Sequence, residues 1–445
     1  MQFVIVTPSY NLDKFIDQTI ASVVFQHGDF TIRYHVQDGG STDGTLKILE
    51  KWKRLISSSD FPKLCRGVSF SYSVEKDNGM YDAINRGFTF ARKPEPESGS
   101  ETNGQPKPRK SPHPLYSKLL SSYEVVRQDE PEAEQNVVMT WLNADDIFYP
   151  GALTAVTSFF REHPSANLVG GIINIMSSDG FVFKLWPIRG YSRIKMALGI
   201  YDGRKDAFVM QEGTFWTAGL WNKIGGLDPA LRYAGDFDLW FRFAQHAEYH
   251  QLETLLASHR RRVGQLSSNL TSYFAEVDSI QNKDGGDMVL PRHTKTSSRI
   301  SDGTFTYDLD SGSWKFSAMD QPVWLPKAGF SGEEGPFASE GIVSGRWIIA
   351  PEVEAVLQCN EAGLYDINID YRNPLGANEV VLSGEPMSME REAMSVRKRM
   401  TVRRELVDGW NLLNMTFAKT NTVEGDPRPL VIFLEDISME PVAIG

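Results

Sequence analysis

The sequence predicts an α/β domain with a mostly parallel sheet, followed by a second domain built as an antiparallel β-sandwich. Over the first part of the chain, short apolar runs alternate with helical patterns, which is typical of parallel sheets with helical crossovers. Near the C-terminus, GLYDINIDYR at residues 363–372 alternates apolar and polar side chains, which indicates a strand with one face on a core. The 445 residues also exceed the roughly 250–300 beyond which single cores stop growing, so two domains are expected.

The elements of the first domain follow from the spacing of apolar residues. Residues 3–6 form a short apolar run before Thr-Pro-Ser, as expected for a strand buried on both faces. The same reasoning predicts the next elements in order: helix 13–26, strand 32–36, helix 45–55, strand 70–74, helix 81–91, strand 137–142, helix 151–163, a hairpin of 168–176 with 181–185, and a helix around 239–244.

Two polar stretches set the expected boundaries. Residues 93–136 are rich in Pro, Gly, Ser and charges, which predicts an exposed, partly disordered insertion with a short helix near 115–126. Residues 276–300 are polar and are expected to form a linker. The predicted domains are therefore 1–275, which contains the insertion, and 301–445 for the sandwich.

Composition narrows the class of protein. The net charge of −11 argues against a nucleic-acid partner, which needs a positive surface. Cys65 and Cys359 are too far apart in sequence for a zinc motif and form no disulfide framework, so a reducing compartment is expected. The N-terminus lacks the pattern of a signal peptide, and no window is apolar enough to span a membrane. These features predict a cytoplasmic protein and are compatible with peripheral attachment to the inner face of the membrane.

The first polar cluster follows the strand at 32–36 and reads QDGGSTDGT. The glycine pair lets the backbone approach a ligand closely, and Asp38 could accept a hydrogen bond from a base or a ribose hydroxyl. The alternative is that residues 41–43 cap the helix that starts at Thr45. Neither a P-loop nor a dinucleotide-binding fingerprint is present.

Two further clusters contain carboxylates. In WLNADDIFYPGAL, Asp145 and Asp146 follow a strand and, with Asn143, could bind Mg²⁺ or Mn²⁺ through oxygen ligands. The alternative is that Asp146 only caps the turn before Pro150. In LRYAGDFDLWFRFA, Asp236 could serve as an N-cap or as a general base.

Taken in order, five motifs resemble inverting glycosyltransferases of family 2, which have the GT-A fold. The motifs are TPSYN, DGGSTDGT, EKDNGMYDAINRG, WLNADDIFYPGAL and GGLDPALRYAGDFDLWFRFA, within roughly residues 1–265. The resemblance implies a nucleotide-sugar donor, a divalent cation (Mn²⁺ or Mg²⁺) and transfer with inversion at the anomeric carbon. The acceptor would be a carbohydrate or a lipid-linked carbohydrate, in polysaccharide or glycoconjugate synthesis.

The resemblance also implies roles for particular residues. The residues that would bind the donor are Pro8, Tyr10, Asp38, Asp77 and Asp145. The metal ligands would be Asp145, Asp146 and His259, with Asn143 in place of the first acid often seen in the family's D-x-D-type motif.

On the acceptor side, Asp236 matches the catalytic base, and Gln211 and Trp240 would face the acceptor.

Two alternatives remain for the diphosphate end of the site. Either His259 completes the metal site, or Arg260 or Arg262 contacts the diphosphate. The Q-x-x-R-W motif of processive polymerases is absent, which favours a single transfer per encounter.

Two other functions fit parts of the sequence. A sugar nucleotidyltransferase would use a similar α/β domain and metal, but TPSYNLDK does not resemble the Gly-rich basic loop usual there. A non-catalytic carbohydrate-binding protein would act through the sandwich. Four tryptophans of the predicted sandwich could stack on sugar rings, and the alternative is that they belong to its core: Trp314, Trp324, Trp347 and Trp410.

Overall fold

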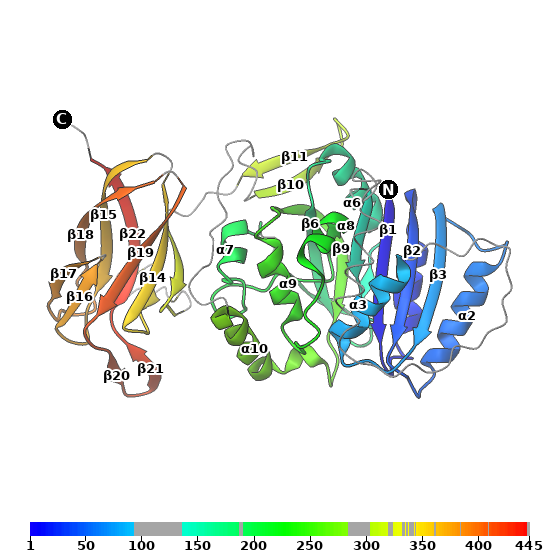
Figure 1. Ribbon diagram of the computed structural model, residues 1–445, viewed down its shortest axis with the longest axis horizontal. Helices are drawn as coiled ribbons and strands as arrows, with labels where there is room; N and C mark the ends of the chain where they lie inside the picture. Colours follow the sequence, from blue (N-terminus) through cyan, green and yellow to red (C-terminus); the bar gives the residue numbers. More distant parts are fainter. Residues whose placement is uncertain are drawn as a thin grey trace.

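The computed structural model describes residues 1–92, 136–186, 190–283 and 303–318, and most of 324–442 (Figure 1). Within 324–442, the residues not described are 332–333, 335–336, 338–341, 343, 360–361, 383 and 408. The predicted insertion, with its helix near 115–126, lies outside the described residues except for Asn136. The predicted linker lies outside them from residue 284 onward.

One half of the first sheet is parallel. Its strands are β1 (Gln2–Ser9), β2 (Gly28–Asp38), β3 (Cys65–Val74) and β4 (Val137–Trp141), in the order β4-β1-β2-β3. The crossover helices between the first three strands and after β3 are α1 (Ile16–Val24), α2 (Thr45–Ser57) and α3 (Met80–Ala91). The carboxyl ends of these strands therefore meet at one edge of the sheet, which is where ligands bind in such folds.

The other half of the first sheet is mixed and continues from β4. Its strands are β8 (Thr214–Thr217), β6 (Leu168–Met176) and β9 (Tyr249–Arg260), in that order; β8 is antiparallel to both neighbours, and β6 is parallel to β9. The short strand β5 (Ile147–Phe148) pairs with β9. The predicted hairpin is present, because β7 (Val182–Leu185) returns antiparallel to β6.

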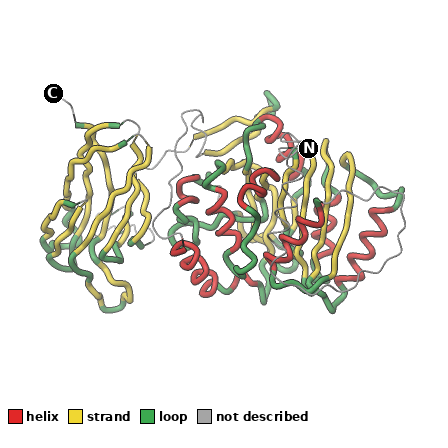
Figure 2. The backbone as a smooth tube through the Cα atoms, viewed as in Figure 1, coloured by secondary structure: helices red, strands yellow, loops and turns green. Residues whose placement is uncertain are grey.

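Helices cover both faces of this sheet (Figure 2). One core forms under α1, α2 and α6 (Ala152–Glu162). The core on the opposite face lies under α3, α7 (Arg193–Ala197), α8 (Ala218–Ile224) and α9 (Gly235–Phe243). A mixed sheet between two helical layers confirms the predicted GT-A architecture.

The hairpin of β10 (Gly303–Asp308) and β11 (Ser313–Ala318) extends the first sheet, because β10 pairs in parallel with β9. Phe305, only 2% exposed, packs edge-on against Phe159 of α6 with ring centroids 5.0 Å apart. The first sheet therefore continues past the boundary that the sequence predicts at residue 301. Similarly, α10 (Leu270–Lys283) occupies the start of the predicted linker.

The predicted antiparallel sandwich follows (Figure 1). One sheet has the order β12-β14-β19-β16-β17, with β12 (Trp324–Ala328), β14 (Glu352–Cys359), β16 (Asn378–Leu382), β17 (Glu385–Met389) and β19 (Gly409–Phe417). The other has the order β13-β22-β15-β18, with β13 (Arg346–Trp347), β15 (Gly363–Arg372), β18 (Lys398–Leu406) and β22 (Phe433–Pro441). A small ladder joins β20 (Asn421–Val423) to β21 (Asp426–Leu430).

The alternating stretch in β15 lies as predicted. Ile367, Ile369 and Tyr371 belong to the core between the two sheets. The four tryptophans considered for sugar stacking are all buried or partly buried, and Trp314 belongs to the first sheet. Among the described helices, none combines the length and the apolar character that a membrane-spanning segment needs.

The sandwich packs against α7 of the first domain. Leu325 and Val356 of the sandwich form one buried cluster with Ile194, Leu198 and Ile200 on and after α7, and Trp410 packs on its edge. From the same helix, the Arg193 guanidinium donates to the carbonyl oxygens of Ala244 (2.7 Å) and Gln245 (3.1 Å), just past the end of α9.

Candidate active site

The predicted donor residues gather at the carboxyl ends of β1, β2 and β3. Ser9 pairs with Asp38, and Asp38 with Val74, so the loops that follow these strands are neighbours. A Cβ added at Gly39 would lie 2.8 Å from Asp77 Oδ2 and 3.5 Å from Tyr10 Cδ2. A side chain at position 39 would therefore have to displace the Asp77 carboxylate, which lies close to the backbone of Gly39.

The buried Asp38 side chain organises its own loop. Its Oδ1 accepts from the backbone N–H of Gly40 (3.0 Å) and Ser41 (2.7 Å), and its Oδ2 accepts from Ser41 Oγ (2.7 Å). Pro8 is buried in β1, whereas the Tyr10 ring is 61% exposed. Four residues predicted to bind the donor thus lie together at this edge of the sheet, and Tyr10 is the exposed one: Pro8, Tyr10, Asp38 and Asp77.

Asp77 is partly buried in the loop between β3 and α3. Its Oδ1 accepts from the backbone N–H of Gly79 at 3.0 Å. Burial raises the pKa of Asp77, and the nearby Asp82 carboxylate raises it further. Asp82 forms an ion pair with Arg86 on α3, with 2.7 Å between charged atoms.

The adjacent acids after β4 have different partners. Asp146 is fully buried; its Oδ1 accepts from the backbone N–H of Arg260 at 2.7 Å, and its Oδ2 from Asn143 Nδ2 at 3.1 Å. The Asp145 carboxylate instead pairs with Arg262, whose Nε lies 2.6 Å from Oδ2. Burial raises the pKa of both acids, and for Asp145 the neighbouring Asp146 charge adds to the rise.

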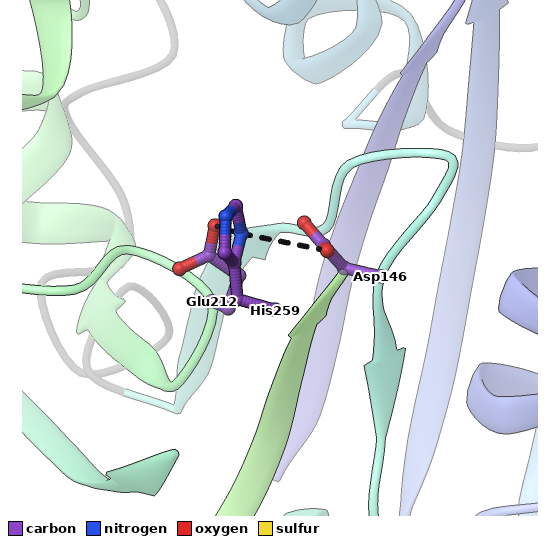
Figure 3. Close-up of side chains that lie close together, drawn as sticks. All are labelled: Asp146, Glu212 and His259. Carbon is purple, nitrogen blue, oxygen red and sulfur yellow. Dashed lines mark hydrogen bonds and ion pairs between the residues drawn. The ribbon is translucent and has the colours of Figure 1, made fainter. Parts of the chain in front are cut away.

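Three side chains from distant segments converge in a possible metal site (Figure 3). His259 Nδ1 lies 3.1 Å from Glu212 Oε1 and 3.6 Å from Asp146 Oδ1, and one ligand atom from each residue lies within 4.8 Å of the others. Asp146 and His259 are predicted metal ligands, and the structure brings them together. The predicted ligand Asp145 is not in this group.

Glu212 is a site residue that the sequence analysis did not identify. It lies in the loop before β8, and its Oε2 is buried without a hydrogen-bond partner. A buried carboxylate oxygen without a donor is costly unless a cation or water satisfies it. The only sequence signal is an acid next to Gln211 before an apolar run, which is too common to single out.

The carboxylates of Asp146 and Glu212 favour a positive charge between them, at the position of His259. Burial works against a charged imidazole, but the carboxylates of Glu212 and Asp146 outweigh it and raise the pKa of His259 to about 11. A protonated His259 thus lies between two carboxylates. A divalent cation bound by the same atoms would take over this role, and His259 would then bind it as neutral imidazole.

Arg260 at the end of β9 and Arg262 just after it differ in exposure and in their partners. Arg260 is buried, and its side chain donates to the backbone oxygens of Asp145 (2.7 Å), Ser177 (3.2 Å) and Ser178 (3.0 Å). These bonds hold the loop that contains Asp145 against the turn before β7. Of the two predicted diphosphate contacts, Arg262 is therefore the better placed, since it is partly exposed beside Asp145.

Asp236 lies in the first turn of α9 and is partly buried. Burial raises its pKa to about 7, the backbone N–H of Phe237 opposes this, and the Glu212 carboxylate adds to the rise. Of the three cluster residues, Glu212 is thus the one whose charge acts on the pKa of Asp236. A carboxylate that titrates near neutral pH suits a general base.

The residues expected to face the acceptor are buried. Gln211 is 5% exposed, and its Nε2 donates to the Trp141 carbonyl oxygen at 2.5 Å. Trp240 is 3% exposed and lies parallel to the Trp141 ring, with centroids 6.3 Å apart. Both side chains therefore pack inside the domain against Trp141.

Comparisons with known proteins agree with the resemblance seen in the sequence. Residues 4–94 match the model of the glycosyl transferase family 2. An uncharacterised glycosyltransferase of Rickettsia prowazekii (strain Madrid E) is 20% identical over 143 residues, which cover 32% of this chain and 45% of the relative. The chain thus matches less than half of the length of that curated relative.

Two solved structures are similar at low identity. Residues 1–349 of S. aureus TarS in complex with UDP-GlcNAc are 15% identical, with 64% of this chain and 71% of that chain covered and a TM-score of 0.38. The mannosyltransferase PcManGT of Pyrobaculum calidifontis, in complex with GDP-Man and Mn²⁺, is 14% identical, with 62% and 64% covered and a TM-score of 0.35.

Proposed function

From the family 2 glycosyltransferase domain that this chain contains at its N-terminal end, we propose that the protein transfers a sugar from a nucleotide-diphosphate donor to a hydroxyl group, with inversion. The observation that carries the proposal is the cluster of Asp146, Glu212 and His259, in which one ligand atom from each residue lies within 4.8 Å of the others. Asp236, whose pKa is raised to about 7 by burial and by the Glu212 carboxylate, supplies the base. Cation-binding groups and a base in one place are what this transfer needs.

The donor nucleotide would bind at the ends of β1, β2 and β3. Tyr10 offers an exposed ring for a nucleobase, and Asp77 borders the same space across Gly39. Asp38 and Pro8 would shape the pocket for base and ribose. The donor is proposed to be a UDP, GDP or dTDP sugar.

The ligand atoms of the three clustered side chains suit a divalent cation. Two carboxylates and one imidazole suit Mn²⁺ or Mg²⁺, and the unpartnered Oε2 of Glu212 is a ligand atom without another role. We propose Asp146, Glu212 and His259 as the ligands, with Asp145 close by in its ion pair with Arg262. When bound, the cation supplies Lewis-acid charge that stabilises the departing diphosphate.

Asp236 would remove the proton of the attacking hydroxyl. The acceptor oxygen forms its bond to the anomeric carbon as the bond from that carbon to the diphosphate breaks, and the proton passes to the Asp236 carboxylate. One carboxylate on the acceptor side is enough for inversion. Arg262 would face the negative charge of the leaving group.

The acceptor is proposed to be a carbohydrate, free or lipid-linked. A lipid-linked acceptor is supported by an exposed apolar edge beside the site, because Phe181, Phe183 and Leu185 are 71%, 49% and 56% exposed. The turn that precedes them is bound to Arg260 through Ser177 and Ser178. The same edge would suit peripheral contact with a membrane surface.

A donor screen tests the proposal. Thermal shift with a panel of nucleotide sugars, with and without Mn²⁺, should identify the donor, and NMR of the product should show an inverted anomeric centre. If instead the protein releases pyrophosphate from a sugar 1-phosphate and a nucleoside triphosphate, it is a nucleotidyltransferase. Binding of glycans without any turnover would favour a carbohydrate-binding protein.

A further inference from the structure

The helix that carries Asp236 is held at its start by a carboxylate from elsewhere in the chain. Glu276 of α10 accepts from three consecutive backbone N–H groups. Its Oε1 lies 3.0 Å from the nitrogen of Arg232, and its Oε2 lies 2.7 Å from that of Tyr233 and 2.9 Å from that of Ala234. These residues lead directly into α9, two positions before Asp236.

The start of α9 has no side-chain cap of its own. The residue at its N-cap is Ala234, which has no side chain that could accept from the first amides of the helix. Glu276 provides acceptors for the amides just before the helix, and its negative charge is favourable near the positive end of the helix dipole. The carboxylate thus anchors residues 232–234, which lead into the first helical residue, Gly235, and we call this anchor the Glu276 cap.

Apolar contacts hold the same two helices together. Val277 and Ile280 of α10 are buried in one cluster with Ala234 and Phe237 at the start of α9. Phe237 is the neighbour of Asp236, and its backbone N–H donates to Asp236 Oδ1 at 2.9 Å. The position of α10 is therefore coupled to the backbone that orients the proposed base.

We infer that Glu276 is a positioning residue for sugar transfer, because its carboxylate fixes the backbone from which Asp236 reaches the acceptor hydroxyl. This inference rests on the role of Asp236 in the proposed function. Misplacing a reacting group by about 1 Å costs on the order of a hundredfold in rate. Loss of the cap should therefore lower kcat and leave donor binding unchanged, since the donor residues lie on other loops.

A matched pair of variants separates positioning from general stability. Glu276→Ala removes the acceptor, and Glu276→Gln keeps one oxygen that can accept from the amides. Asp278→Ala is the control: Asp278 lies on the same helix and pairs with Arg204 at 2.6 Å, but it contacts none of the three amides. Both alanine variants loosen α10, and only the first uncaps α9.

The kinetic measurement uses the full chain with its identified donor. We expect Glu276→Ala to lower kcat by about tenfold to a hundredfold, with the KM for the donor changed by less than about twofold. Glu276→Gln should restore most of the lost rate, and Asp278→Ala should keep it. If Asp278→Ala loses as much rate as Glu276→Ala, in step with its melting temperature, the inference is overturned.

Hydrogen exchange gives a readout that does not depend on turnover. The amides of residues 232–234 should exchange faster in Glu276→Ala than in the wild type, and at the wild-type rate in Asp278→Ala. Unchanged exchange in Glu276→Ala overturns the inference whatever the activity. Faster exchange in a protein that transfers no sugar would uphold the cap and place the failure in the proposed function.

Discussion

Asp236 combines a proposed catalytic role with a cost to stability. Burial raises its pKa from the ordinary value of 3.8 to about 7. The folded protein therefore holds this proton more tightly than the unfolded chain, so stability decreases as the pH rises from about 4 to about 7. At about 1.4 kcal/mol per pKa unit, the shift corresponds to at most about 4 kcal/mol. Since the side chain is partly exposed, we expect roughly half of that.

The substitution Asp236→Asn keeps the shape of the side chain and removes the titration. The free energy of unfolding of the variant, relative to the wild type, should rise by about 2 kcal/mol between pH 4.5 and pH 8. The same variant should lose about a hundredfold or more in kcat, because general base catalysis typically contributes that much. The dissociation constant for the donor nucleotide should not change.

Urea unfolding followed by tryptophan fluorescence measures the stability. Most of the tryptophans lie before residue 319, so the signal reports mainly the first domain. A stability difference that does not vary with pH would show that the Asp236 charge is not costly to the fold. Wild-type turnover in the same variant would refute its role as the base.

Other substitutions test the metal site, the domain boundary and the contact between the domains. Glu212→Gln should weaken Mn²⁺ binding by at least about tenfold in calorimetry, because it removes one charged ligand; unchanged affinity would exclude Glu212 as a ligand. Phe305→Ala should destabilise the first domain by about 3–5 kcal/mol, whereas Tyr307→Ala on the same strand, 39% exposed, should cost less than about 1 kcal/mol. Leu198→Asp should separate the sandwich from α7 and increase the radius of gyration in X-ray scattering, and an unchanged radius would contradict the role of this contact.

The sequence predicts those parts of the site that lie at the ends of regular strands. Asp38 and Asp146 follow stretches that the sequence predicts to be strands, and the carboxyl ends of parallel strands share one edge of a sheet. Glu212 could not be found in this way. It precedes a short antiparallel strand, and its approach to His259 depends on how β6, β8 and β9 pair, which no local pattern reveals.

The domain boundary shows a second limit of sequence patterns. The stretch from Gly303 to Asp308 alternates as a strand should, but alternation does not say which sheet the strand joins. Its polar face is bound to β9, where Thr304 Oγ1 donates to Glu253 Oε1 at 3.0 Å. The preceding polar residues suggested a linker, so the hairpin was expected in the sandwich. Likewise, aromatic residues such as Trp240 look alike in sequence whether they face a ligand or a core.

The contact between α7 and the sandwich has a mechanical consequence. Arg193 of α7 donates hydrogen bonds to the backbone just past the C-terminal end of α9. Apolar residues on and after α7 pack against Leu325 and Val356 of the sandwich. A displacement of the sandwich would therefore be transmitted through α7 to α9, the helix that carries the proposed base.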